Sequence, residues 1–273
     1  MRKGAPHAHD DPTVPEQPEV ERAAARLRAA LVGRRLRDVV ALHPAIGRTL
    51  DDATARSLAG RTVVAVERRG KHQFLRLDDG RTLHAHFRMA GDWDLGRDDV
   101  PLPRHARAVL TCDDGTRIAL VDPRALSALV VLAADGALPS LGPEADDPSL
   151  DAAALRAALE RRRGPIKPVL LDQRVLAGVG NIYAAEALWH ARISPRAVAS
   201  SLSRARIERL LAGVRTALVA GARAATRYSA DAEGASLEVY GREGEPCRRC
   251  GAAIRRIVQA GRSTYYCPRC QRS

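Results

Sequence analysis

The sequence lacks any long run of apolar residues. No stretch of its 273 residues approaches the roughly 18 that a membrane-spanning helix needs. The first twenty residues also lack an apolar run and include Asp10, Asp11 and Pro12, so no secretory signal is legible. Hydrophobic residues make up 45% and charged residues 28%, which excludes a disordered chain. We therefore expect a soluble, cytoplasmic protein with no membrane partner, long enough for one large or two ordinary domains and a small module.

Lysine is scarce as well. Only Lys3, Lys71 and Lys167 are lysines, and the other 41 of the 44 basic residues are arginine. A coding bias toward arginine explains this, and it singles out Lys71 and Lys167 as positions where a compact ammonium or a titratable amine is required. Basic residues exceed the 32 acidic ones, for a net charge of +12. That excess indicates a polyanionic partner such as nucleic acid, although surplus charge also serves solubility alone.

Cysteine is infrequent, but four of the five cysteines are closely spaced. Cys247, Cys250, Cys267 and Cys270 form two C-x2-C pairs separated by sixteen residues. Each pair supplies two thiolates from one tight turn, which suits a structural site for one Zn²⁺ with four thiolate ligands. Two disulfides are the alternative, and the absence of a legible secretory signal argues against them. We expect Cys112 to lie in a buried strand and to carry no chemistry.

The segment between the two cysteine pairs predicts a β-hairpin. Residues 252–258 and 263–266 are strand-like, and the turn at 259–262 places Arg262 at its tip. From Cys247 to the end there are seven arginines and no acidic residue. We expect so basic a zinc ribbon to contact phosphate; fixing the end of the fold is the alternative role.

Periodicity divides the remainder of the chain into a β-rich part and a helical part. Residues 1–14 show no periodicity and predict a disordered tail, and a helix follows from Pro18 until Gly33 ends it. A polar, breaker-rich stretch at 141–148 marks the boundary between the two parts. The strand-like segments are 62–67, 73–77, 82–86, 106–112 and 116–121, and the helical ones are 150–163, 167–176, 182–190 and about 204–225. Ile207, Leu210, Leu211, Val214 and Leu218 form one apolar stripe on the last helix, which we assign to the core.

A glycine-rich turn at residues 177–181 precedes one of these helices. Such a turn offers free backbone N–H groups at a helix N-terminus, where a phosphate can bind. A plain connection between two helices is the competing interpretation.

Several motifs occur in order and together resemble one family. They are PEQPEVE at 15–21, DPR at 122–124, LGPE at 141–144, GPIKP at 164–168, GVGNIYA at 178–184 and VYGR at 239–242, followed by the four cysteines. This combination is similar to the formamidopyrimidine-DNA glycosylase and endonuclease VIII family of base-excision repair enzymes. The resemblance runs from Pro15 to the C-terminus and implies an α+β multidomain protein.

The resemblance also implies a division of the chain. Residues 15–140 correspond to an N-terminal β-sandwich catalytic domain and 141–149 to a linker. Residues 150–236 correspond to a DNA-binding domain with a helix–two-turn–helix element, and 237–273 to the zinc ribbon. Damaged double-stranded DNA is the implied partner, and we expect the protein to act as a monomer near the nucleoid.

The implied chemistry centres on an N-terminal proline. In this family the proline amine attacks the sugar C1′ of a flipped nucleotide, releases the damaged base and cleaves the strand through an iminium. Pro15 matches that nucleophile, and Glu16 matches the neighbouring acid/base; alone, Glu16 is equally a helix-dipole partner. Glu19 matches a pocket carboxylate, and Lys71 matches the lysine at the lesion's phosphate and catalytic site.

Other residues match DNA contacts of the family. Lys167, Asn181 and Arg262 match phosphate contacts. Met89 and Arg124 match two of the side chains that fill the gap left by the flipped base. Without the motif context they would be a core methionine and a surface arginine.

The sequence departs from the family pattern first at Pro15, because a proline nitrogen inside a peptide is an amide that cannot attack C1′. The preceding residue is Val14, and GUG is a bacterial start codon that encodes valine when read internally. We predict that translation begins at position 14 as Met and that removal of this Met exposes Pro15. A true extension that is removed by proteolysis, or an inactive lesion-binding protein, are the alternatives.

Two further departures concern specificity. Leu126 stands where the family commonly has phenylalanine as a third intercalating side chain. The segment 226–236 is shorter than the loop that caps 8-oxoguanine in formamidopyrimidine-type enzymes, as in endonuclease VIII-like enzymes that remove oxidised pyrimidines. We expect excision of oxidised and ring-opened purines and cleavage of abasic sites by β,δ-elimination, with weaker activity on 8-oxoguanine. An endonuclease VIII-like enzyme that removes oxidised pyrimidines is the alternative.

Overall fold

The structure is a computed structural model, and it describes residues 14–134, 136–223 and 237–272. Residues 1–13 of the predicted tail and the whole 226–236 loop therefore lie outside the described residues. The chain forms two compact units. We call residues 19–139 the sandwich unit, and residues up to Pro18 together with 140–273 the helical unit. None of the helices in the described ranges is both long and apolar enough to cross a bilayer.

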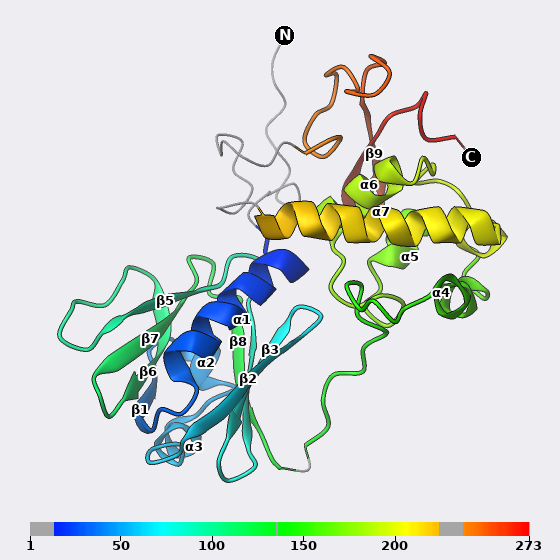
Figure 1. Ribbon diagram of the computed structural model, residues 1–273. Coiled ribbons are helices and arrows are strands. Elements are labelled where there is room, and N and C mark those ends of the chain that lie inside the picture. Colours follow the sequence, from blue (N-terminus) through cyan, green and yellow to red (C-terminus); the bar gives the residue numbers. More distant parts are fainter. Residues whose placement is uncertain (1–13, 135, 224–236, 273) are drawn as a thin grey trace. The chain divides into compact units, whose positions relative to one another are not determined.

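Two four-stranded antiparallel sheets build the sandwich unit (Figure 1). One has the order β1-β6-β7-β5 and the other β2-β3-β4-β8. Helix α1 (Gln17–Leu31) contributes its buried face to the core that the two sheets share. The strands are β1 (Leu36–Ala41), β2 (Val63–Arg69), β3 (His72–Leu77), β4 (Thr82–His86), β5 (Asp92–Arg97), β6 (Ala106–Cys112), β7 (Thr116–Val121) and β8 (Ala128–Leu132), and the short helices are α2 (Pro44–Gly47) and α3 (Asp52–Arg56).

The predicted strands are present, and tight turns explain their register. Gly80 and Gly115 adopt positive φ in the turns after β3 and β6, as the Asp-Asp-Gly sequences predict. Sequence reasoning did not identify β1, β5 and β8. Cys112 is buried at the end of β6, as expected.

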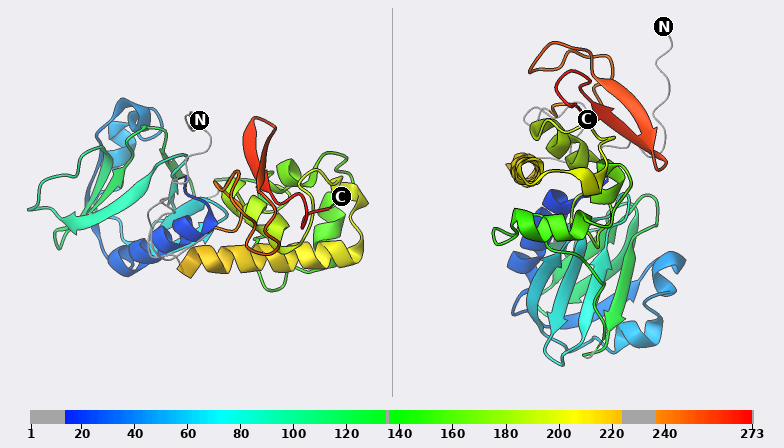
Figure 2. Two further views of the ribbon diagram at one scale, coloured as in Figure 1. Left: turned by 90° about the horizontal axis from the view of Figure 1, so that it is seen from above. Right: turned by 90° about the vertical axis from the view of Figure 1, so that its right-hand side faces the viewer.

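The helical unit packs around a second core. Its elements are α4 (Ala152–Leu159), α5 (Ile166–Leu170), α6 (Asn181–His190), the 3-10 turn η1 (Ala199–Ser201), α7 (Arg204–Arg223) and the hairpin β9 (Arg255–Gln259) and β10 (Arg262–Tyr266). The apolar stripe predicted on α7 is buried, so it belongs to the core. Figure 2 shows the hairpin extending away from α7 within this unit.

Helices α4 and α5 are shorter than predicted. Helix α5 ends at Leu170, and the Asp172 carboxylate then accepts a hydrogen bond from the backbone N–H of Arg174 at 3.0 Å in a non-helical turn. Val175 and Leu176 still enter the core from this turn. Their burial produces a helix-like apolar pattern without a helix.

Candidate nucleic-acid interface

The N-terminus of α6 is occupied by a carboxylate from the far end of the sequence. Glu16 is buried and accepts hydrogen bonds from the backbone N–H groups of Gly180 (2.9 Å), Ile182 (2.8 Å) and Tyr183 (3.2 Å). A negative charge at a helix N-terminus satisfies unpaired donors and opposes the helix dipole. A Cβ at position 180 would overlap this carboxylate, so glycine is needed there. The expectation of free N–H groups in this turn is wrong for these three donors, because Glu16 takes them.

This arrangement fixes the position of Pro15. Pro15 is buried and directly precedes Glu16, and the backbone N–H of Gln17 donates to the Gly178 carbonyl at 3.3 Å. Two kinds of hydrogen bond therefore hold the chain after Pro15 against the glycine-rich turn: those of the Glu16 carboxylate and that of the Gln17 backbone. Sequence reasoning assigned functions to both segments but gave no sign that they meet.

Lys167 and Asn181 come together in a buried polar network. The Lys167 ammonium, 1% exposed, donates to the Asn181 carbonyl oxygen, to the Ser263 carbonyl (2.8 Å) and to Thr264 Oγ1 (2.9 Å). Asn181 Nδ2 donates to the Tyr240 hydroxyl at 3.2 Å. The network joins α5, α6 and β10, so the predicted phosphate residues Lys167 and Asn181 bind protein atoms here and hold the hairpin.

Arg262 is exposed, but it lies in a strand and not at the tip of the turn. It is the first residue of β10 and pairs with Gln259. The turn itself consists of Ala260 (φ 47°) and Gly261 (φ 72°). A two-residue turn with positive φ at both positions matches the twist of the two strands, which moves Arg262 one position into the ladder.

The four clustered cysteines fit a zinc ion. Their Sγ atoms all lie within 4.8 Å of one another, with 3.5 Å between Cys250 and Cys267 and 4.0 Å between Cys247 and Cys270. Four sulfurs at about 2.3 Å from one tetrahedral zinc lie about 3.8 Å apart. Burial and the neighbouring sulfurs raise the pKa of Cys270 to about 12, so a cation is needed for all four to ionise. These residues would hold one structural Zn²⁺, as the spacing predicted.

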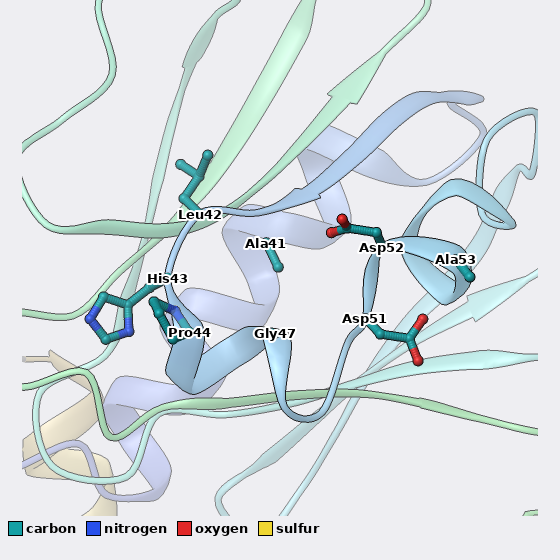
Figure 3. Close-up of a pocket in the computed structure, with 8 residues that line it drawn as sticks. All are labelled: Ala41, Leu42, His43, Pro44, Gly47, Asp51, Asp52 and Ala53. Atoms are coloured by element: carbon teal, nitrogen blue, oxygen red, sulfur yellow. The ribbon is translucent and has the colours of Figure 1, made fainter.

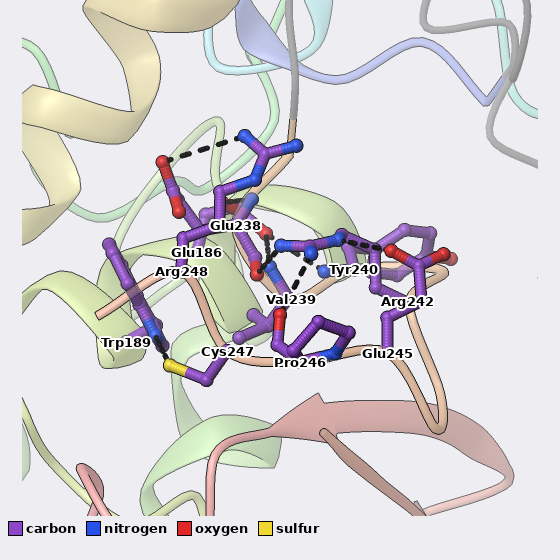
Figure 4. A network of polar contacts seen from close by, with 10 residues as sticks. All are labelled: Glu186, Trp189, Glu238, Val239, Tyr240, Arg242, Glu245, Pro246, Cys247 and Arg248. Atoms are coloured by element: carbon purple, nitrogen blue, oxygen red, sulfur yellow. Dashed lines mark hydrogen bonds and ion pairs between the residues drawn. The ribbon is translucent and has the colours of Figure 1, made fainter. Parts of the chain in front are cut away.

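Trp189 and Glu186 of α6 both bind the segment 238–247 that leads into the zinc site, as Figure 4 shows. Trp189 Nε1 donates to Cys247 Sγ at 3.4 Å, and the Arg249 guanidinium stacks 3.8 Å from the indole centroid. The buried Glu186 carboxylate accepts the backbone N–H groups of Glu238 (2.8 Å), Val239 (3.0 Å) and Tyr240 (2.9 Å). Burial raises the pKa of Glu186 above its ordinary value, although these three hydrogen bonds act to lower it. Sequence reasoning missed both Trp189 and Glu186.

In the sandwich unit, one buried aspartate organises the DPR turn. Asp122 Oδ1 accepts from the backbone N–H of Arg124 at 2.9 Å, and Oδ2 accepts from those of Leu126 and Ser127, both at 2.7 Å. Although burial raises the pKa of Asp122, these hydrogen bonds and that of the Ser127 hydroxyl hold it below its usual value. The turn leaves Arg124 and Leu126 exposed, as a role in filling a DNA gap requires.

The turn that carries Met89 is joined to the DPR turn. Ser127 Oγ lies 2.8 Å from Asp122 Oδ2 and 3.1 Å from the Phe87 carbonyl, which also accepts the Gly91 N–H at 3.1 Å. Met89 lies between Phe87 and Gly91 in the sequence and is half-buried. Met89, Arg124 and Leu126 are therefore carried by two connected turns. Lys71 lies in the turn between β2 and β3, and Glu19 lies in the first turn of α1; both are half-buried.

Comparison with known proteins decides the family. Family models match in order: the formamidopyrimidine-DNA glycosylase N-terminal domain at residues 14–129, the H2TH domain of the same enzyme at 141–230, and a zinc finger found in FPG and IleRS at 244–272. The formamidopyrimidine-DNA glycosylase of Rhizorhabdus wittichii is 38% identical and that of Herpetosiphon aurantiacus 43%; the alignments cover 95% and 94% of this chain and all of each relative. The chain belongs to the formamidopyrimidine-DNA glycosylase family.

Solved structures of this family agree with the fold. The Lactococcus lactis formamidopyrimidine-DNA glycosylase bound to DNA with an abasic site superimposes with a TM-score of 0.85 at 31% identity. A family member in complex with DNA containing carbocyclic 8-oxo-G gives a TM-score of 0.87, also at 31% identity. Each comparison covers 95% of this chain and all of the other. The resemblance drawn from the motifs, the α+β fold class and the four-cysteine zinc site are confirmed.

A surface hollow of about 690 Å³ in the sandwich unit is separate from these features (Figure 3). It lies over the segment from β1 to α3. Asp51 Oδ1 accepts the Thr54 N–H at 2.7 Å, and His43 Nδ1 accepts the Ala45 N–H at 3.1 Å, so both side chains cap short helices. No residue predicted to act in this formamidopyrimidine-DNA glycosylase family member lines the hollow, which is formed by Ala41, Leu42, His43, Pro44, Gly47, Asp51, Asp52 and Ala53.

Proposed function

We propose that this protein is a base-excision repair DNA glycosylase that removes oxidised and ring-opened purines from duplex DNA. Full-length membership of the family supports this, because its relatives carry that enzyme's name and solved neighbours hold damaged DNA. At the level of residues, the proposal is supported by the hydrogen bonds that anchor Glu16, and with it the adjoining Pro15, at the N-terminus of α6.

We further propose that the enzyme is an abasic-site lyase. The Pro15 amine attacks the sugar C1′, the C1′–base bond breaks, and the departing base takes a proton. The C1′–O4′ bond then breaks and O4′ takes a proton, which leaves an iminium between Pro15 and the opened sugar. Loss of a C2′ proton to this electron sink expels the 3′ phosphate, and loss of a C4′ proton then expels the 5′ phosphate, which completes β,δ-elimination. Glu16 transfers protons at the sugar, and its three backbone hydrogen bonds hold the carboxylate beside the nucleophile.

This mechanism needs Pro15 to carry a free secondary amine. An α-amino group has an ordinary pKa of about 8, so a useful fraction is neutral near pH 7. The family match begins at residue 14, immediately before Pro15. We propose that the active chain begins at Pro15, after removal of an initiator Met translated at position 14.

The remaining roles are proposals as well. Lys71 acts at the lesion's phosphate, Glu19 in the lesion pocket, and Met89 and Arg124 in the gap left by the flipped base. Arg262 contacts phosphate from its exposed position on β10. Lys167 and Asn181 contact phosphate once their bonds to each other and to β10 open, because here the Lys167 ammonium is buried and its three donors are used on protein atoms.

Borohydride trapping on an abasic-site duplex tests these proposals, using one chain from Met1 and one that starts Met-Pro15. A covalent adduct only with the short chain supports the lyase and the start site. An adduct with neither chain despite tight binding would instead indicate an inactive lesion-binding protein. A kinetic panel of lesions then ranks the substrates, and a panel led by 8-oxoguanine would contradict the expected ranking.

A further inference from the structure

Three histidines form a cluster on β3 and β4 that the proposed mechanism does not use. His72 Nδ1 lies 2.8 Å from His84 Nε2, and the two rings stack with centroids 5.0 Å apart. His86 is the cross-strand partner of His72, and its ring meets that of His72 edge-on at 4.5 Å. All three are half-buried.

The cluster lies on the outer face of the sheet β2-β3-β4-β8. Gln73 and Leu75 on β3 and Leu83 and Ala85 on β4 alternate with the histidines and are buried. Three of these four belong to the core of the sandwich unit. Because neighbouring residues of a strand point to opposite faces, the histidines face away from that core.

The hydrogen bonds define where protons can reside. Between His72 and His84 one imidazole supplies an N–H and the other a lone pair, so the neutral pair shares one proton at this contact. The outer nitrogen of the accepting ring carries that ring's own proton, so one further proton can be held on the outer nitrogen of the donating ring (His72 Nε2 or His84 Nδ1, depending on the tautomer) without breaking that bond. His86 Nδ1 accepts the backbone N–H of Arg88 at 2.9 Å, which places the proton of neutral His86 on Nε2.

The charges around the cluster are positive. Burial, the neighbouring imidazoles, Arg88 and Lys71 lower the pKa of His72 to about 4 and that of His86 to about 3, and burial and Arg88 also lower the pKa of His84. The cluster is therefore neutral near pH 7.

The neighbouring strands supply no free carboxylate to the cluster. On β2, Arg69 is opposite His72, and Glu67, opposite Phe74, is paired with Arg76 at 2.9 Å. On β8, the residues opposite His86 and His84 are Ala128 and Val130. Among the described residues, no carboxylate appears among the charges that act on the three histidines. An anion that reaches this face would favour the protonated form of the cluster.

We propose that the His72–His84 pair is a proton-linked contact for a DNA phosphate diester, so that binding of the duplex takes up one proton from solvent. This inference rests on the proposed function. Lys71, proposed to act at the lesion's phosphate, directly precedes His72, and the gap-filling Met89 lies three residues after His86. The diester stays ionised, the proton resides on an outer ring nitrogen of the pair, and no covalent bond changes.

Calorimetry of binding tests the proposal, using a duplex with an uncleavable tetrahydrofuran abasic analogue. The heat of binding at pH 6.5, measured in buffers of different ionisation enthalpy, gives the number of protons taken up. We expect about one proton for the wild-type chain and close to none for His72→Gln and His84→Gln. Between pH 7.5 and 6 the wild-type Kd should fall about five- to tenfold, and the Kd of either variant less than about twofold, because each proton taken up changes affinity by up to tenfold per pH unit.

The control is His43→Asn, which removes a histidine of the same unit outside the cluster and keeps an acceptor at the cap of α2. It should match the wild type in proton uptake. Thermal melting of each variant shows whether it is folded. Tight binding by the wild type without proton uptake would overturn the proposal and leave the glycosylase assignment intact, as would unchanged uptake in folded His72→Gln and His84→Gln. Failure of the wild type to bind the lesion duplex would overturn both.

Discussion

Replacement of Asp122 by asparagine tests how the turn that carries Arg124 and Leu126 is built. Asp122 accepts from Arg124 with one carboxylate oxygen and from Leu126 and Ser127 with the other. The asparagine side chain would keep one of these oxygens and replace the other by an NH2 group, which cannot accept. If the oxygen stays at the Oδ2 position, the Arg124 N–H loses its acceptor, and a buried unpaired donor costs about 1–3 kcal/mol. The bonds from Leu126 and Ser127 lose their charge assistance, about 1 kcal/mol each, and relief from burying a charge offsets part of this.

We therefore expect Asp122→Asn to lower the free energy of unfolding by about 2–4 kcal/mol in urea denaturation. Affinity for the tetrahydrofuran duplex should fall by about tenfold, equivalent to about 1.4 kcal/mol, because the turn no longer presents Arg124 and Leu126 in one conformation. Asp113→Asn is the matched control: Asp113 is an exposed hairpin residue whose ion pair with Arg35 spans 3.8 Å, and its loss should change stability by less than about 0.5 kcal/mol.

The pH dependence of Asp122 provides a second readout of the same bonds. Its pKa in the folded protein lies below the ordinary 3.8, so the folded state favours the ionised carboxylate. The stability it contributes is present above pH 3.8 and is lost as the pH falls through the lower, folded-state pKa. The difference between wild type and Asp122→Asn should accordingly shrink below pH 3.8. Equal stability and DNA affinity of the two proteins at pH 7 would refute this account of the turn.

Three other substitutions test contacts of α6. Gly180→Ala should lower both the melting temperature and the yield of trapped adduct, because the added methyl displaces the Glu16 carboxylate; an unchanged adduct yield would contradict that reasoning. Trp189→Phe should weaken zinc binding by about tenfold in a chelator competition while the fold is retained, because the ring still packs but no longer donates to Cys247; equal zinc affinity would show the N–H···S bond to be unimportant. Glu186→Gln should lower the free energy of unfolding by about 1–3 kcal/mol in urea denaturation by leaving a backbone donor of 238–240 unpaired, and wild-type stability would exclude this clamp.

The parts of the molecule that sequence predicted are those set by local spacing. The two C-x2-C pairs place four sulfurs within reach of one ion because each pair lies in one turn. The Asp-Asp-Gly turns fixed the hairpins β3–β4 and β6–β7 for a similar reason. The start of α1 and the buried stripe of α7 followed from residues a few positions apart.

What the sequence did not reveal depends on contacts between distant residues. Glu16 meets Gly180 across 164 positions, and nothing near either residue indicates the partner. The pairing of His72 with His84 depends on the register of β3 and β4, and a slip of one residue would send one of them into the core. Strands β5 and β8 were not predicted because each is stabilised by pairing with another strand, β7 or β4, and this pairing is not visible in the local sequence.

Helix α6 joins the segment at Pro15 and Glu16, which we propose to be catalytic, to the zinc ribbon within ten residues. Its first turn holds Glu16, Asn181 belongs to the Lys167 network, Glu186 clamps 238–240, and Trp189 donates to Cys247. Ile182 and Ala185 pack in the core around the ribbon, whereas Tyr183 and Ala187 pack in the core of the helical unit. A helix buried on both sides cannot shift at one end without disturbing the other, because packed interiors transmit strain. Loss of zinc should therefore reduce not only the proposed phosphate binding by the ribbon but also the anchoring of Glu16 at the N-terminus of α6.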